Sequence, residues 1–216
     1  MAVTRARSLQ DYVDETKLPK IAAELRAAGI ANTPTLFINH VGSTQMVAES
    51  LAAWPEMRYV PPRLLASWIR QVKRAQDQGV SPDRSARYLE YRNHLAKGLS
   101  DGGALLLVGS DAPNAFVVPG FGTIYEIHSL TVAGLTRYQA LRAATRNAAE
   151  FMRAEREFGT VAPGLRADLV LLDGNPLTDV SNLTLRAGVM LRGRWIPKEE
   201  LDAMLEKVAA MYKPNQ

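Results

Sequence analysis

Residues 104–113 read ALLLVGSDAP: five apolar residues in a row, followed by an abrupt change to small and polar ones. A strand that is apolar at every position is covered on both faces, which is typical of a parallel sheet flanked by helices. The break at Gly109 places Ser110 and Asp111 at the carboxyl end of this strand, where parallel α/β folds position ligands and catalytic groups. The segment therefore predicts an α/β fold with Asp111 as a candidate site residue.

A second buried strand is expected upstream, at residues 33–38, which read TPTLFI. Its β-branched and apolar residues favour an extended conformation, with Pro34 at the entry of the strand. His40 would then follow the carboxyl end of this strand, from where its ring could reach toward Asp111. Residues 40–61 have no clean period, and we expect a long loop there with a short helix.

Three helices are expected around these strands. Apolar residues recur at three- and four-residue steps over residues 18–28, and Gly29 ends this first helix. Pro62 suits the first position of a second helix that ends near residue 79. Ser81 caps the third helix.

A fourth helix is expected to begin at Thr136, because Gln139 stands three residues on and completes a capping box. Its inward-facing residues would be Leu141, Ala144, Ala148 and Phe151. The alternation of strands and helices indicates βα units and hence α/β architecture.

The pattern changes after Phe158, where short strands are expected at residues 167–172, 188–191 and 194–196, followed by a closing helix after Pro197. The sequence thus predicts an α/β part at residues 1–157. A small β element with a C-terminal helix is expected to follow at residues 158–216.

Composition narrows the chemistry. The 216 residues are 47% hydrophobic and 22% charged, as expected of a globular protein, and no apolar run is long enough for a membrane span. Residues 1–20 lack the apolar core of a signal peptide, so cytoplasmic location is the default expectation. The absence of cysteine excludes disulfides, thiolate nucleophiles and cysteine-bound zinc. Any metal would depend on carboxylates and on His40, His94 and His128.

The net charge of +4 comes mostly from basic residues between Arg58 and Lys97. A basic patch can attract nucleic acid. Apolar residues interleave with the basic ones at helical spacing, which favours the solvated faces of two helices instead. We therefore expect no nucleic-acid partner and no membrane partner.

Two interpretations of Asp111 remain at this level. Aspartate is common in turns and caps, where its role is structural. At the end of a buried strand, it could equally bind a metal or move a proton.

Gly109–Pro113 resembles the last-strand metal motif of the amidohydrolase superfamily. The resemblance continues in order and spacing through residues 104–195, and residues 33–36 extend it upstream. It covers nearly the whole chain and is closest to the imidazolonepropionase-like and dipeptidase-like branch.

The resemblance implies a distorted TIM barrel with a small β-sandwich, of which this chain would supply the last two or three βα units and part of the sandwich. It also implies one or two divalent ions, usually zinc. Asp111 would be a metal ligand and the proton shuttle in the hydrolysis of C–N bonds of amides, cyclic amides or dipeptides. Ser110, Ala112 and Asn114 would line the substrate site.

The sequence departs from this pattern at several points. It contains no His-x-His motif. By the resemblance, its first strand corresponds to the family's seventh, so strands one to five and their ligands would be absent, and we expect the same of the sixth. Ile124 stands where close relatives often carry histidine. His40 is the one candidate for a replacement ligand. We therefore expect no stoichiometric zinc in this chain alone.

Two alternatives to an enzyme stay open. The chain could be a truncated or split, non-catalytic piece of a larger assembly, or, more remotely, a basic nucleic-acid-binding module. Its partners would be a small amide or peptide substrate, a missing N-terminal portion, or a second copy of itself. An unpaired apolar strand edge in a partial barrel would promote aggregation or pairing between chains.

Overall fold

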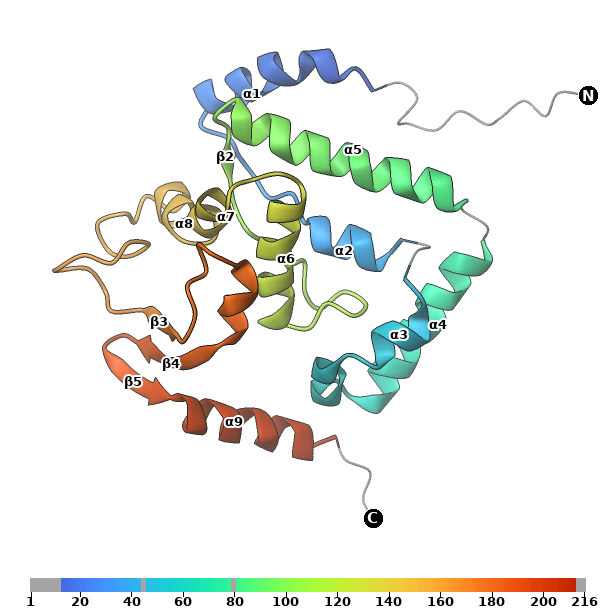
Figure 1. Cartoon of the computed structure of the whole chain (residues 1–216), viewed down its shortest axis with the longest axis vertical. Coiled ribbons are helices and arrows are strands. Elements are labelled where there is room, and N and C mark those ends of the chain that lie inside the picture. The colour runs from blue at the N-terminus through green and yellow to red at the C-terminus, as the bar shows by residue number, and fades with distance from the viewer. Residues whose placement is uncertain (1–12, 44–45, 79–80, 213–216) are drawn as a thin grey trace, which may run out of the picture.

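The computed structural model describes residues 13–43, 46–78 and 81–212. Its elements are arranged as in Figure 1. In chain order they are the 3-10 helix η2 (Glu15–Lys17), α1 (Leu18–Ala27), β1 (Ala31–Asn32), α2 (Leu36–Val41), α3 (Ala48–Ala52), the 3-10 helix η3 (Pro55–Tyr59), α4 (Pro62–Asp77), α5 (Pro82–Asp101), β2 (Leu105–Leu106), α6 (Phe121–Val132), α7 (Arg137–Ala144), α8 (Arg146–Phe151), β3 (Leu169–Leu172), the 3-10 helix η4 (Val180–Thr184), β4 (Arg186–Leu191), β5 (Arg194–Pro197) and α9 (Lys198–Ala210).

The two strands β1 and β2 pair in parallel, with Ala31 opposite Leu105 and Asn32 opposite Leu106. The backbone N–H of Leu107 extends the pairing by donating to the carbonyl of Asn32 at 2.8 Å. The expected parallel arrangement is therefore confirmed for this pair. The sheets of the described residues do not close into a barrel, because one has two strands and the other three.

The prediction of a strand at residues 33–38 is wrong. Pairing ends at Asn32, and Leu36 already begins helix α2. Pro34 has no N–H for a sheet ladder, and Thr35 adopts a left-handed backbone conformation with φ of 48°. The next two N–H groups bind a buried carboxylate instead of a strand, as described below. Leu36 and Phe37 are apolar because they are buried, and not because the backbone is extended there.

The strand β2 is shorter than the apolar run at residues 104–108 suggested. On the side of β2 away from β1, the carbonyl of Leu106 accepts a hydrogen bond from Asn147 Nδ2 at 2.8 Å. The N–H of Val108 donates to the carbonyl of Ala143 at 3.3 Å. Helices α7 and α8 thus occupy part of the edge that we expected to be unpaired.

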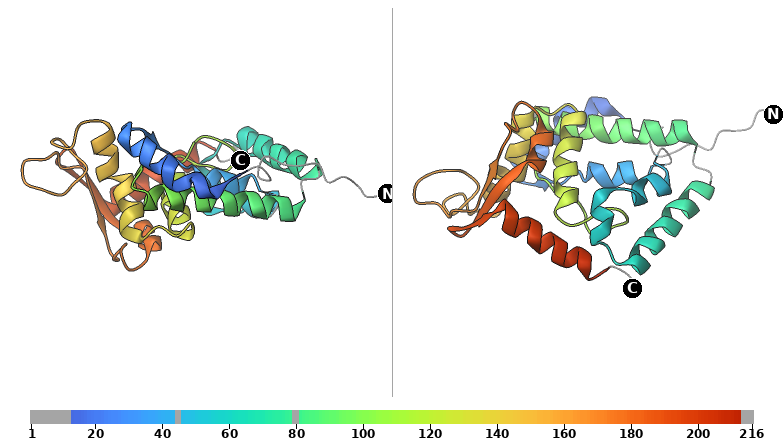
Figure 2. Two further views of the ribbon diagram at one scale, coloured as in Figure 1. Left: turned by 90° about the horizontal axis from the view of Figure 1, so that it is seen from above. Right: turned by 60° about the horizontal axis from the view of Figure 1, so that its bottom comes forward.

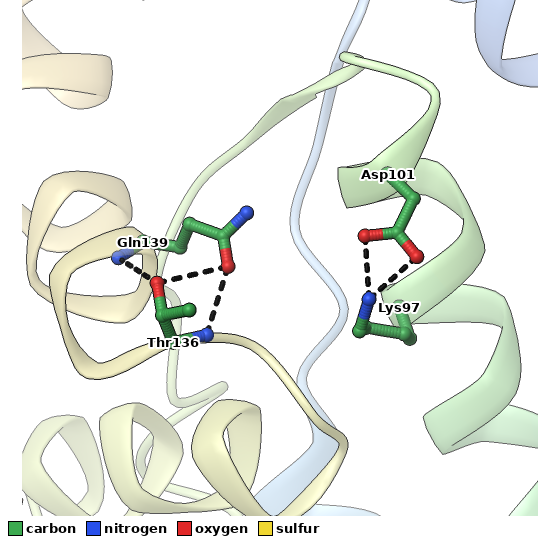
Figure 3. Close-up of polar contacts among 4 residues, drawn as sticks. All are labelled: Lys97, Asp101, Thr136 and Gln139. Atoms are coloured by element: carbon green, nitrogen blue, oxygen red, sulfur yellow. Dashed lines mark hydrogen bonds and ion pairs between the residues drawn. The ribbon is translucent and has the colours of Figure 1, made fainter.

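The helix signals in the sequence are largely confirmed. Helix α1 ends at Ala27, and Gly29 beyond it has a positive φ of 65°. The side chain of Ser81 accepts a hydrogen bond from the N–H of Arg84 at the start of α5. The capping box of Thr136 and Gln139 is formed at the start of α7 (Figure 3). Beside it, the same figure shows the ion pair of Lys97 with Asp101 on the last turn of α5.

The fourth helix is interrupted at Thr145, which has irregular dihedral angles, so it forms two short helices, α7 and α8. Because of this break, α8 does not continue the inward face that we expected for a single helix. Phe151, predicted to face inward, is 56% exposed, whereas Ala140 and Ala143 are buried.

Helices α1 and α5 lie side by side along one edge of the molecule (Figures 1 and 2). A glycine allows this close approach, because a Cβ added at Gly102 would lie 2.3 Å from the Cβ of Ala22.

Two hydrophobic cores stabilise the α/β part. The first lies between α1, α5, β2, α6 and α7 and includes Leu36, Leu99, Leu106 and Leu130. The second lies between α2, α3, α4 and residues 116–118 and includes Phe37, Leu51, Trp68 and Phe116. Helix α2 contributes to both.

The C-terminal part forms the antiparallel sheet β3-β4-β5, against which α9 packs. Helix α9 also contacts η3, where Arg58 forms an ion pair of 2.6 Å with Glu206. The domain boundary predicted at residues 157 and 158 stays a prediction. Within the described ranges, no helix has the length and apolarity required to cross a bilayer.

Candidate functional site

Asp111 follows β2 in an exposed turn, as the sequence predicted. Its backbone is left-handed, with φ of 58°, a conformation that aspartate and asparagine tolerate better than most residues. Its carbonyl oxygen accepts two hydrogen bonds from Asn114, one from the backbone N–H at 3.2 Å and one from Nδ2 at 2.7 Å. The turn is thereby closed by Asn114, and the carboxylate of Asp111 stays exposed to solvent.

Small residues hold the Asp111 turn close to two other segments. A Cβ added at Gly109 would lie 2.5 Å from Cγ2 of Thr33, in the connection between β1 and α2. A Cβ added at Gly122, in the first turn of α6, would lie 3.0 Å from Cβ of Ser110 and 2.7 Å from Cγ1 of Val117. The turn is therefore held between the β1–α2 connection and the start of α6.

Glu126 on α6 joins those same two segments. Its side chain is fully buried, and its carboxylate accepts hydrogen bonds from the backbone N–H groups of Leu36 at 2.9 Å and Phe37 at 2.7 Å. These are N–H groups of the first turn of α2, which carry partial positive charge and favour an anion. Glu126 thus caps a helix that lies 90 residues earlier in the chain.

Burial raises the pKa of Glu126 above its ordinary value, and the two backbone hydrogen bonds and Arg92 oppose that rise. Arg92 also donates to the carbonyl of Pro34 at 2.6 Å, just before α2. Glu126 was not among the predicted site residues, because a single acid in an apolar segment gives no sign of its partner. It does stand within residues 104–195, the run that resembles the amidohydrolase superfamily.

A second buried carboxylate, Glu56, lies beside the aromatic group formed by Phe37, Trp54 and Tyr125. The hydroxyl of Tyr125 donates to Glu56 Oε1 at 2.6 Å. Burial, with the neighbouring charge of Glu56, raises the pKa of Tyr125. The rings of Phe37 and Tyr125 stack with centroids 4.7 Å apart. These aromatic rings pack against one another.

His40 does not follow a strand. It lies in α2, and the prediction that placed it at a strand's end is wrong because the chain turns helical at Leu36. The half-buried ring lines a pocket with Glu90 and His94 of α5, whereas the turn at Asn114 lines a different one. Burial and the nearby His128 lower the pKa of His40. Whether His40 binds a metal stays a prediction.

The described residues do not fit a metal centre. Across residues 13–43, 46–78 and 81–212, no three histidine or carboxylate side chains come together in a way that could hold an ion. A catalytic zinc usually has three protein ligands. A three-ligand site that includes Asp111 would therefore need at least one ligand from outside these residues.

The three residues predicted to line the substrate site, Ser110, Ala112 and Asn114, lie in three different environments. Ser110 packs against Gly122, and Ala112 is half-buried against the second core. Asn114 is exposed and lines a small cavity between α2 and α4. Their contact with a substrate stays a prediction.

Comparison with known proteins identifies relatives of this chain. The model of the amidohydrolase family matches residues 6–196. Adenine deaminase of Rubrobacter xylanophilus is 29% identical over 109 residues, which make up 50% of this chain and 18% of that protein.

Two solved structures share the fold. The bottromycin amidohydrolase superposes with a TM-score of 0.67 and 23% identity, covering 96% of this chain and 47% of that one. A Xaa-Pro dipeptidase with methionine bound in its active site has a TM-score of 0.54 and 18% identity, covering 86% and 38%. The chain spans less than half the length of each of these proteins. The family match over most of the sequence shows that the chain belongs to the amidohydrolase family.

Proposed function

We propose that this chain is the C-terminal part of a metal-dependent amidohydrolase, a partial TIM barrel that contributes Asp111 to the active site. The observation that carries the proposal is the position of Asp111, exposed beyond the carboxyl end of a parallel strand and held there by Gly109 and Asn114. Loops at this end of parallel strands carry catalytic groups in α/β enzymes. Family membership supports a hydrolytic reaction.

The proposed reaction is hydrolysis of a C–N bond in an amide, a cyclic amide or a dipeptide. In it, the carboxylate of Asp111 accepts a proton from the attacking water and returns it to the leaving nitrogen, as a general acid–base. Family resemblance implies a divalent ion, zinc, in the complete site. Because the described residues do not form that ion's site, we derive no step through the ion.

A second proposal is that the chain is a non-catalytic piece of an assembly. The absence of a group of three ligands among the described residues favours it. Zinc content of the purified chain tests this second proposal, and we expect far less than one zinc per chain. About one zinc per chain, lost on Asp111→Ala, would show that the chain forms a metal site by itself and would overturn the assembly proposal.

The catalytic proposal is tested on the protein isolated from its source, at whatever length it occurs there. We expect it to hydrolyse at least one member of a panel of amides, cyclic amides and dipeptides. Asp111→Asn should reduce the rate by a factor on the order of 10² or more, because general acid–base catalysis is lost. Asp101→Asn, on the exposed end of α5, is the control and should keep full activity. An unchanged rate for Asp111→Asn would exclude the proposed role.

The basic residues of η3, α4 and α5 give little support to a nucleic-acid function. Several already have partners within the chain: Arg58 pairs with Glu206, Lys73 with Glu49, Lys97 with Asp101, and Arg92 with the carbonyl of Pro34. We propose that the chain does not bind nucleic acid. Salt-sensitive DNA binding would contradict this.

A further inference from the structure

A small cavity lies between helices α2 and α4 and the turn that follows Asp111. Its volume is about 110 Å³. Its apolar wall comes from three separate segments: Ile38 and Val41 of α2, Val72 and Ala75 of α4, and Ala115 beyond the turn. Such convergence of distant segments around one space is typical of a ligand subsite.

Among the described residues, no charged side chain lines this cavity. Three of its polar side chains each give one donor to a carbonyl of the protein. Gln76 Nε2 donates to the carbonyl of Met46 at 2.7 Å, Ser43 Oγ to that of His40 at 2.7 Å, and Asn114 Nδ2 to that of Asp111 at 2.7 Å. Most of the lining is apolar, so a charged group placed here would lose its hydration without an opposite charge to compensate. The cavity therefore favours a hydrocarbon group.

The volume restricts that group further. An apolar cavity of about 150 Å³ holds benzene. At about 110 Å³, this cavity is smaller than the one that holds benzene, which favours a branched group of roughly three to five carbon atoms over a six-membered ring.

The cavity shares one residue with the closure of the Asp111 turn. Asn114 lines the cavity and also fixes the carbonyl of Asp111 through its backbone N–H and its side chain. A group bound in the cavity would therefore contact Asn114, which closes the turn that carries Asp111.

The walls of the cavity are fixed before any ligand arrives. Val41 and Val72 are 2% and 7% exposed, and both belong to the second core. Helix α2, which carries Ile38 and Val41, is anchored at its first turn by Glu126. A preformed pocket of this kind loses little entropy on binding.

We propose that this cavity binds a small branched aliphatic group of the substrate, such as isopropyl or isobutyl. The reaction in this proposal rests on the proposed function. The nature of the bound group rests on the cavity alone. The proposal narrows the substrate class to amides or dipeptides with an aliphatic residue at this position.

The experiment measures binding to the purified chain by NMR of the methyl groups of Ile38, Val41 and Val72. The probes are isovaleramide, which carries an isobutyl group, and acetamide, which carries a methyl group. We expect isovaleramide to shift these methyl signals saturably and to bind more tightly than acetamide by a factor on the order of ten or more, because it buries three more carbon atoms. Equal shifts with both amides would overturn the proposal.

Variants on one helix provide the controls. Ala75→Leu fills the cavity and should abolish the response to isovaleramide. Ala66→Leu, on α4 but outside the cavity lining, should leave the response unchanged. If Ala75→Leu does not fold, Val72→Ala enlarges the cavity and should allow cyclohexanecarboxamide to bind. Retained isovaleramide binding in folded Ala75→Leu, or no gain with Val72→Ala, would contradict the assignment.

These experiments distinguish failure of the cavity assignment from failure of the catalytic proposal. Saturable isovaleramide shifts without hydrolysis of any amide would support the cavity and contradict the catalytic proposal. Hydrolysis that is indifferent to the acyl group, without methyl shifts, would support the catalytic proposal and contradict the cavity assignment.

Discussion

Glu126 accepts a hydrogen bond of 2.7 Å from the backbone N–H of Phe37, although 89 residues separate the two in the chain. The same carboxylate binds the N–H of Leu36. This contact joins helix α6, which follows the Asp111 turn, to helix α2, which follows β1. The segments beyond both parallel strands are thus held by one buried side chain.

Glu126→Gln tests that connection. The amide keeps one acceptor oxygen but turns an NH₂ group toward the second backbone N–H, so one buried donor loses its partner. We expect the free energy of unfolding to fall by about 1–3 kcal/mol, measured by urea denaturation. The exposed Glu155→Gln is the control and should change it by less than about 0.5 kcal/mol. A wild-type value for Glu126→Gln would contradict the structural role.

Stability should also depend on pH through Glu126. Its pKa is raised in the folded state by burial, so the folded protein holds this proton more tightly than the unfolded chain does. The contribution is present below the ordinary glutamate pKa and is lost as pH rises through the raised folded-state pKa. Asp14, Glu49, Asp168 and Asp179, whose pKa values are lowered, act in the opposite direction and at lower pH.

Urea denaturation at a series of pH values from about 4.5 upward, above the ordinary glutamate pKa, measures this dependence. Through Glu126, the stability of the wild-type chain should fall with rising pH in that range relative to that of Glu126→Gln. His40, whose pKa is lowered, contributes a gain of stability with rising pH to both proteins. Identical pH profiles for the two proteins would exclude Glu126 as the source.

Tyr125→Phe removes the hydroxyl that donates to buried Glu56. The carboxylate of Glu56, 2% exposed, would lose that partner. We expect a loss of about 1–3 kcal/mol in the free energy of unfolding. Tyr138→Phe, at a site that is 63% exposed, should have no measurable effect. Equal stabilities of the two variants would argue against a role for the hydroxyl of Tyr125.

Gly109→Ala should disturb the Asp111 turn, because the new methyl group would lie 2.5 Å from Cγ2 of Thr33. Overpacking of this kind costs about 1–3 kcal/mol. Thr33→Ser removes the methyl group in conflict, so the double variant should recover most of the loss. A double-mutant cycle measures this coupling. Additive effects of the two substitutions would show that the close contact does not exist.

Signals that act within a few residues were predictable from the sequence. Gly29, Ser81 and the capping box of Thr136 with Gln139 mark helix ends through contacts with nearby backbone, and all three are confirmed. The position of Asp111 beyond a buried strand was predictable for the same reason, because the apolar run ends abruptly at Gly109.

Features that depend on distant partners were not predictable. Residues 36–38 are apolar in a strand-like pattern, yet they form a helix because Glu126 binds the N–H groups of its first turn. The sequence contains no local trace of that pairing. Likewise, nothing near Leu106 in the sequence shows that its carbonyl accepts a hydrogen bond from Asn147, 41 residues away.

Leu36 and Phe37 are adjacent in the chain, but Leu36 packs in the first core and Phe37 in the second. Neither core can open without displacing α2 and so disturbing the other. Local unfolding should therefore be suppressed between them, and amide protons in both cores should exchange with solvent at a common free energy. The α/β part would behave in hydrogen exchange as one cooperative unit, even though its hydrophobic residues form two groups.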